Sequence, residues 1–167
     1  IEGIERIQFT TSHPFEFGQD LIDTFAEVPE LISYVHLPVQ SGSNEILKQM
    51  RRRHSREEYL EIISKLKSAR ADISISSDFI VGFPGETKKD FNATLRLIEQ
   101  VNFAQSYSFK YSKRIGTKAS EFEDQLSEKA KQKRLARVIS LQNYHSIQRN
   151  QQLIGSIQDV LVEKQSK

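Results

Sequence analysis

The chain has 167 residues, of which 37% are hydrophobic and 28% charged, and it carries a formal net charge of +2 and no cysteine. This is the composition of one globular domain with a core of its own. Without cysteine, these residues hold no disulfide, thiolate zinc site, cysteine nucleophile or cysteine-ligated iron–sulfur cluster. No run approaches the ~18 apolar residues that span a bilayer and no signal peptide is recognisable, so we expect a cytoplasmic protein.

Four β-rich runs are predicted as strands, at residues 4–10, 34–39, 73–81 and 106–111. Helical patterns follow them, over 43–50, from the capping box at Ser55, from Thr87, and over 127–150. A helix between successive strands returns the chain so that the strands lie parallel. We therefore expect an α/β fold with a parallel sheet.

The strand faces predict which parallel fold it is. In the run 73–81, Ile75 and Phe79 share one face while Ser76 and Asp78 share the other, and the two preceding runs divide in the same way. A doubly wound sheet is apolar on both faces, and a packed eight-stranded barrel fills its lumen with Val, Ile and Leu. We expect a TIM-like partial barrel whose polar concave face lines a ligand cavity.

Four β/α units are too few to close a barrel, so the first predicted strand is expected to be an exposed edge through which two copies could pair. The run 157–163 is predicted to be one further strand that lacks a partner. The sequence also begins at Ile1 rather than at a methionine. Both features indicate a fragment of a longer chain.

The sharpest motif runs from Asp78 to Thr87, where a predicted strand ends in a Pro84-Gly85 turn and enters a capped helix. Gly85 supplies the positive φ of a type II turn, and Gly82 allows a ligand to approach the backbone closely. Ligands of parallel β/α folds bind at the C-terminal ends of strands, where this loop lies. The alternative interpretation is a tight turn without a ligand.

A second strand-end loop runs from His36 to Ser43. Gln40 and Ser41 are suited to hydrogen-bond a ribose or an amino-acid group, and Ser43 is placed to cap the next helix. Pro38 makes a bulge in the strand the alternative. Arg52 follows near the opening of the same expected cavity, where its guanidinium is suited to bind a carboxylate in a bidentate manner.

Two segments are basic, since residues 48–56 carry five cations and no acid, and further cations are spread over 110–118. The default interpretation of each is a solvated face. His13 ends the first predicted strand, where a structural hydrogen bond is favoured over a role as proton carrier. His54 and His145 have no partner in the sequence pattern and are interpreted as structural.

Five motifs in this order resemble those of the radical S-adenosylmethionine methylthiotransferases, over about residues 1–163. They are Phe9-Thr10-Thr11-Ser12-His13-Pro14, His36-Leu37-Pro38-Val39-Gln40-Ser41-Gly42-Ser43, Met50-Arg51-Arg52, Ser77-Asp78-Phe79-Ile80-Val81-Gly82-Phe83-Pro84-Gly85-Glu86-Thr87 and Ser106-Tyr107-Ser108-Phe109. The first motif resembles the tRNA-modifying branch of the family rather than the branch that modifies a ribosomal protein.

The resemblance implies a parent enzyme with two 4Fe-4S clusters, a radical-SAM partial barrel of six β/α units and a small C-terminal RNA-binding β-barrel. Such an enzyme cleaves S-adenosylmethionine to a radical, and it adds a methylthio group to C2 of N6-isopentenyladenosine next to the anticodon. It also implies tRNA and a flavodoxin-like reductant as partners.

The six cluster-binding cysteines of that family are absent here. By the resemblance, residues 1–150 are the C-terminal two thirds of the barrel, its last four β/α units. Residues 151–167 are then the truncated start of the RNA-binding, TRAM-like domain. The fragment alone is expected to bind no cluster and to be inactive.

The family's site residues transfer to matching positions of this chain. The expected contacts of S-adenosylmethionine are Gln40, Ser41, Arg52, Ile80, Val81, Gly82 and Phe109. Asp78 is expected in the lumen beside the cofactor or target base, as a candidate catalytic residue. Lys113 and Arg114 are expected to meet the tRNA backbone.

Two alternatives remain at this point. One is a related methylthiotransferase that acts on threonylcarbamoyl-adenosine or on a ribosomal protein. The other is a cofactor-free β/α module that binds RNA through its basic segments.

Overall fold

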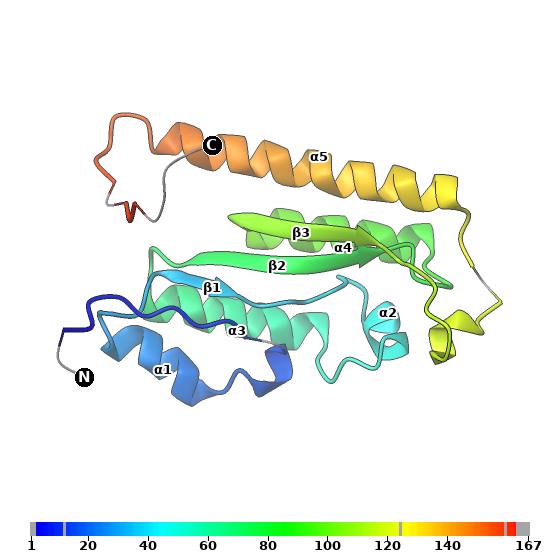
Figure 1. Cartoon of the computed structure of the whole chain (residues 1–167), viewed down its shortest axis with the longest axis horizontal. Helices are drawn as coiled ribbons and strands as arrows, with labels where there is room; N and C mark the ends of the chain where they lie inside the picture. The colour runs from blue at the N-terminus through cyan, green and yellow to red at the C-terminus, as the bar shows by residue number, and fades with distance from the viewer. Residues whose placement is uncertain (1–2, 12, 124, 159, 163–167) are drawn as a thin grey trace.

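The computed structural model describes residues 3–11, 13–123, 125–158 and 160–162. Its centre is a three-stranded parallel sheet in the order β1-β2-β3, formed by Tyr34–His36, Ser74–Val81 and Gln105–Lys110 (Figure 1). The register pairs Val35 with Ile75 and Asp78 with Tyr107. The predicted parallel α/β architecture is confirmed.

The described part of the chain also contains five α-helices and two short 3-10 helices. They are η1 (Pro14–Glu16), α1 (Gln19–Glu27), α2 (Asn44–Gln49), α3 (Arg56–Ala69), α4 (Lys88–Val101), η2 (Lys118–Ser120) and α5 (Glu128–Gln152). Helix α5 runs alongside β3 (Figure 1). None of the helices in the described part of the chain combines the length and hydropathy of a membrane-spanning segment.

The predicted helix starts are confirmed by their caps. The hydroxyls of Ser43, Ser55, Thr87 and Ser127 each accept a hydrogen bond from a backbone N–H in the first turn of α2, α3, α4 and α5. Ser55 and Thr87 form complete capping boxes, in which Glu58 and Asp90 accept from the backbone N–H of the cap. Each cap satisfies amides that would otherwise have no partner inside the helix.

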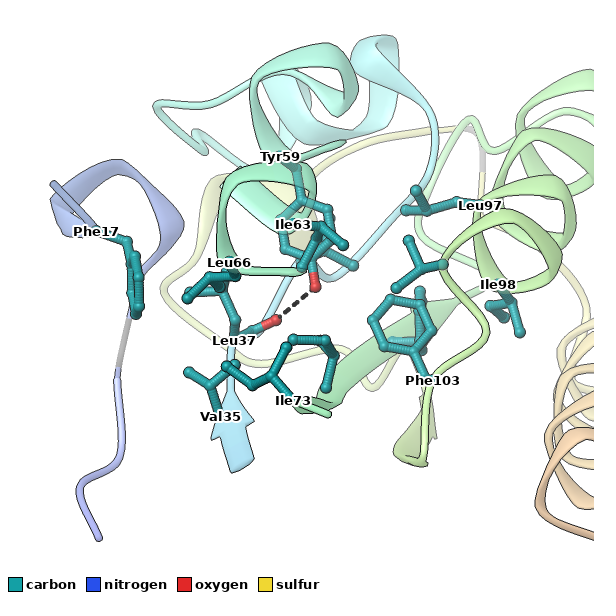
Figure 2. Close-up of a cluster of buried hydrophobic side chains, with 14 of the residues drawn as sticks. Phe17, Val35, Leu37, Tyr59, Ile63, Leu66, Ile73, Leu97, Ile98 and Phe103 are labelled. Carbon is teal, nitrogen blue, oxygen red and sulfur yellow. Dashed lines mark hydrogen bonds between the residues drawn. The ribbon is translucent and has the colours of Figure 1, made fainter. Parts of the chain in front are cut away.

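The hydrophobic core lies on one face of the sheet, beneath α3 and α4 (Figure 2). Leu37 and Phe79 are fully buried there, and the buried Tyr59 of α3 donates its hydroxyl to the carbonyl of Leu37 at 3.0 Å. Each fully buried apolar side chain of this size contributes about 1.5–3 kcal/mol. The opposite face carries His36 and Asp78, which are partly exposed. The expected division into an apolar and a polar face is confirmed.

The predicted strand 4–10 is wrong. Only one parallel bridge forms there, between Ile7 and Leu31, through hydrogen bonds from Ile7 N to Glu30 O at 2.8 Å and from Ile32 N to Ile7 O at 3.0 Å. The adjoining segment turns at Pro29, which has no N–H to extend a ladder. The alternating sequence therefore lacks a strand to pair with, and Ile7 stays 40% exposed.

The predicted strand 157–163 does not form over its described residues 157–158 and 160–162. Ile157 and Val162 are 97% and 83% exposed. A strand needs the hydrogen bonds of a partner strand, and these residues have none within the described chain. Positions 159 and 163 of this run lie outside the described residues.

Candidate functional site

A cavity of about 1090 Å³ opens where β2 and β3 end. Six of the residues expected at the site line it, and these are Gln40, Arg52, Asp78, Ile80, Phe109 and Arg114. The others, Ser41, Val81, Gly82 and Lys113, are outside its lining. The fold therefore brings together residues from four separate motifs, three of which lie at the ends of parallel strands.

Gln40 occupies a strained bend at the end of the β1 segment. Its φ is 75°, in the left-handed region, and its side chain is buried. The backbone N–H of Gln40 donates to Asp78 O and its carbonyl accepts from Ile80 N, both at 2.9 Å. Because His36 pairs with Ser76 but Gln40 bridges to Phe79, one extra residue is accommodated around Pro38. The strand therefore contains the bulge considered for Pro38, and this bulge lies beside the cavity.

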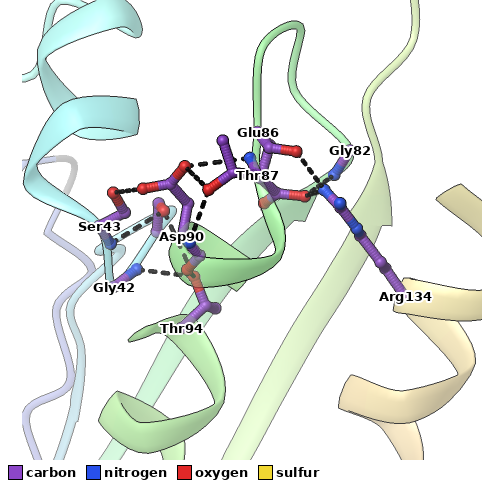
Figure 3. Close-up of polar contacts among 9 residues, drawn as sticks. Gly42, Ser43, Gly82, Glu86, Thr87, Asp90, Thr94 and Arg134 are labelled. Carbon is purple, nitrogen blue, oxygen red and sulfur yellow. Dashed lines mark hydrogen bonds and ion pairs between the residues drawn. The ribbon is translucent and has the colours of Figure 1, made fainter. Parts of the chain in front are cut away.

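The next residues of this loop are locked onto α4. The Ser41 hydroxyl lies 3.3 Å from Thr94 Oγ1 and accepts from Ser43 N at 3.2 Å, while Gly42 N donates to Thr94 Oγ1 at 3.0 Å (Figure 3). A Cβ at Gly42 would come within 2.5 Å of the carbonyl oxygen of Ala93. Ser41 therefore uses its hydroxyl inside the protein.

The loop after β2 adopts the predicted type II turn. Gly85 has a φ of 77° and Glu86 N donates to Phe83 O at 2.9 Å. The buried carboxylate of Glu86 accepts from Gly82 N at 2.8 Å and pairs with Arg134 of α5 (Figure 3). Burial raises the pKa of Glu86, whereas the Gly82 N–H and Arg134 act to lower it.

Asp90 ties this loop to the one after β1. Its carboxylate accepts from the N–H of Thr87, the N-cap of α4, and also from the Ser43 hydroxyl at 2.6 Å (Figure 3). Burial acts to raise the pKa of Asp90, but the hydrogen bonds from Ser43 and Thr87 outweigh it and lower the pKa. The start of α2 and the start of α4 are therefore joined by one carboxylate.

Arg52 is positioned by the end of α2. The N–H of Arg52 donates to Leu47 O and that of Arg51 to Lys48 O, both at 2.9 Å, with Arg51 at a φ of 58°. This is a Schellman motif with Arg51 at the left-handed position. Burial lowers the pKa of Arg52, and the nearby charge of Asp78 opposes that shift. Arg52 brings a half-buried cation to the cavity.

One side chain fixes how α2 and α3 start. Asn44 donates from Nδ2 to Glu57 Oε2 at 2.6 Å and accepts the N–H of Arg56 at 2.7 Å. The starts of α2 and α3 are thereby joined to each other, on either side of the segment that includes Arg52.

Polar groups on the concave face support Asp78 from below. His36 Nε2 lies 3.5 Å from Asp78 Oδ1, and His36 Nδ1 lies 2.8 Å from Ser76 Oγ. The hydroxyl of Tyr34 is 2.6 Å from the same Ser76 oxygen. The sequence placed these residues on one face but did not indicate these contacts.

Two histidines meet at the rim. His13 accepts from Phe15 N at 3.2 Å, which confirms the structural hydrogen bond, and its ring centroid lies 5.2 Å from that of His54. His54 is only 6% exposed, and burial, then repulsion from His13 and Arg52, lowers its pKa to about 4. Within the described ranges, no three His, Asp or Glu side chains gather closely enough to hold a metal ion.

Comparison with known proteins decides the family. The family model described as "Radical SAM superfamily" matches residues 1–98, which is more than half of the chain. The chain belongs to this superfamily. Coproporphyrinogen III oxidase from Escherichia coli, a radical SAM enzyme, has a similar fold, with a TM-score of 0.65 and 20% identity over 80% of this chain and 31% of that one. The partial-barrel fold is confirmed.

Closer relatives carry one name. Proteins called tRNA-2-methylthio-N(6)-dimethylallyladenosine synthase are similar to the whole chain, with 54% identity in Xanthomonas euvesicatoria and 50% in Actinobacillus pleuropneumoniae. This radical SAM chain covers 34% and 35% of those proteins. It therefore spans about a third of the length of the curated relatives it matches.

Proposed function

We propose that this radical SAM chain is part of a tRNA methylthiotransferase that adds a methylthio group to C2 of N6-dimethylallyladenosine, the isopentenyl-modified adenosine next to the anticodon. The observation that carries the proposal is the cavity that joins Gln40, Arg52, Asp78, Ile80 and Phe109. The name shared by the relatives supports this target over threonylcarbamoyl-adenosine, a ribosomal protein or a cofactor-free RNA module.

The residues present fit S-adenosylmethionine. Arg52 offers a half-buried guanidinium to a carboxylate, and Gln40 offers an amide held in a fixed bend. Ile80 and the 54% exposed Phe109 ring provide apolar surface for an adenine. Among the other expected contacts, Val81 and Gly82 are buried outside the cavity lining, and the buried Ser41 holds the loop that carries Gln40.

The residues present do not fit an iron–sulfur cluster. The chain has no cysteine to supply thiolate ligands. We propose that the two 4Fe-4S clusters and the site for a flavodoxin-like reductant belong to sequence outside these 167 residues. In the complete enzyme, one molecule of S-adenosylmethionine would supply the radical that removes the hydrogen from C2, and a second molecule would supply the methyl group.

The chain's own residues hold and orient the ligands. Asp78, with His36 beneath it, offers a hydrogen-bond acceptor in the lumen beside the cofactor or target base. Lys113 and Arg114 lie in the exposed loop after β3, where they meet the tRNA backbone electrostatically. We also propose a domain boundary near residue 150 and a cytoplasmic location for the complete enzyme.

Replacement of Arg52 tests the proposal. In the full-length enzyme, Arg52→Ala should weaken S-adenosylmethionine binding by about tenfold or more, because a charge-assisted bidentate contact is lost. Isothermal titration calorimetry measures this affinity. Arg96→Ala, which removes an exposed cation of α4 outside the cavity lining, should leave it unchanged. Equal affinity in wild type and Arg52→Ala would remove Arg52 from the site.

A further inference from the structure

A second hollow adjoins the cavity. It has a volume of about 480 Å³ and is lined by His13, Phe15, Glu16, Arg51 and Arg53. His13 and Arg51 also line the main cavity, so the two hollows meet across these residues. A ligand in the main cavity therefore lies next to the second hollow, with His13 and Arg51 shared between them. The second volume is large enough for one nucleotide.

Arg51 stands between the two hollows at an unusual backbone position. The left-handed residue that ends a Schellman motif is ordinarily glycine, because a Cβ is unfavourable at positive φ. Here it is an arginine, with an exposed side chain that makes no ion pair among the described residues. No ion pair within the described chain offsets the backbone strain at Arg51, which points to a contact of its side chain with a molecule outside the chain.

Phe15 gives the second hollow a stacking surface. Its ring is 58% exposed, and the guanidinium of Arg53 lies 5.7 Å from the ring centroid. The backbone that carries the ring is anchored, because Pro14 is buried and Phe15 N donates to His13 Nδ1. Proteins recognise single-stranded RNA by stacking bases on aromatic rings and by placing arginines near the phosphates. The second hollow presents both features.

We propose that the second hollow binds the nucleotide that flanks the target adenosine in the single-stranded loop of an RNA. The flanking base stacks on Phe15, and Arg51 and Arg53 contact the adjoining phosphates. Glu16, the acidic residue of the lining, accepts a hydrogen bond from a base N–H. This subsite rests on the proposed function, because it assumes that the target adenosine enters the main cavity.

A double-mutant cycle between protein and RNA tests the stacking contact. The probe is a short RNA hairpin whose loop carries N6-dimethylallyladenosine, together with versions that are abasic on either side of it. Fluorescence anisotropy measures binding to the full-length enzyme. Phe15→Ala should weaken binding of the intact hairpin about tenfold, and one of the abasic changes should do the same. Together they should weaken binding little further than either alone.

Arg51→Gly tests the phosphate contact. It should weaken hairpin binding severalfold and reduce the slope of log affinity against log salt by about 0.7, as loss of one single-strand phosphate contact does. It should also raise the melting temperature, which a merely structural arginine would not do. Matched controls on α5 are Arg137→Ala, and Tyr144→Ala at a ring that is 59% exposed; both lie outside the two linings.

The outcomes separate the two proposals. If wild-type enzyme does not bind the hairpin, the proposed function fails and the subsite fails with it. If wild type binds, but each abasic change weakens hairpin binding by Phe15→Ala as much as hairpin binding by wild type, only the subsite is overturned. An unchanged salt slope in Arg51→Gly would equally overturn the subsite while leaving the proposed function intact.

Discussion

The loops after β2 and β3 end at the same cavity, yet they are built differently. In the first, Phe83 and Glu86 are buried, and Glu86 pairs with Arg134 of α5. In the second, residues 112–118 are all exposed, and Ile115 is 100% exposed. One wall of the cavity is therefore shaped by internal contacts, while the other offers its side chains to a ligand. Substitutions should affect stability at the first wall and binding at the second.

The largest expected effect is at Glu86. Glu86→Ala leaves the largely buried Arg134 without its carboxylate and Gly82 N without its acceptor. Removal of one partner from a buried ion pair should lower the free energy of unfolding by about 3–5 kcal/mol. Urea denaturation measures it. The exposed pair of Lys65 and Glu61 is the control, where Glu61→Ala should cost about 0.5 kcal/mol or less. Equal losses in both variants would contradict the distinction.

The region around His54, at the rim of the cavity, should also be shaped by internal contacts. The pH dependence of the free energy of unfolding tests this. Unfolded His54 takes up a proton near pH 6.5, whereas the folded protein does so only near pH 4. Between these values the unfolded state binds more protons, so stability falls as pH falls, by about 3 kcal/mol in all. The lowered pKa of His13 acts in the same direction.

The measurement for His54 is urea denaturation at several pH values from 7 to 4. His54→Gln should show a shallower loss of stability over this window, because its side chain does not titrate. The same pH dependence in wild type and His54→Gln would show that other groups cause the loss.

Alanine substitution of one glycine in each wall compares the two walls directly. Gly82 and Gly116 both have positive φ, 74° and 84°, so alanine is strained at each. At Gly82 the new Cβ would also lie 2.4 Å from Lys131 Cγ, whereas at Gly116 it meets nothing within 4 Å. We expect Gly82→Ala to cost about 2 kcal/mol or more and Gly116→Ala about 1 kcal/mol. Thermal unfolding would compare the two, and equal costs would mean that only φ matters.

The smallest effect is a gain. Arg51→Gly should raise the free energy of unfolding by about 0.5–1 kcal/mol, because glycine tolerates the left-handed φ of 58° that strains arginine. Denaturant unfolding of the variant measures it. A loss of stability would show that the arginine side chain supports the fold.

Local features were predictable from the sequence because their causes lie within a few residues. The caps at Ser43, Ser55 and Thr87 and the turn at Gly85 each depend on one short segment. The parallel arrangement followed from the helices between strands, and it brought six of the ten expected site residues to one cavity. The run 4–10 failed because a strand also needs a neighbour, which the sequence pattern does not show.

Contacts between distant segments were not predictable. Glu86 and Arg134 are separated by 48 positions, and nothing near either residue indicates the other. The same holds for His36 with Asp78, and for Ser41, whose hydroxyl is used by Thr94 rather than left open to a ligand. Which of two polar neighbours faces a cavity depends on packing that forms only when the whole sheet assembles.

The hydrogen bonds of Asn44 with Glu57 and Arg56 bear on how the residues of such a site can change during evolution. The position of Arg52 is set by two anchored helix starts and by its own N–H bond to Leu47, not by the side chains beside it. Residues 51 and 53 can therefore change identity without displacing the arginine between them. If Arg52 binds the cofactor and residues 51 and 53 bind RNA as proposed, preference for one RNA over another can evolve at these two positions without loss of the proposed cofactor contact.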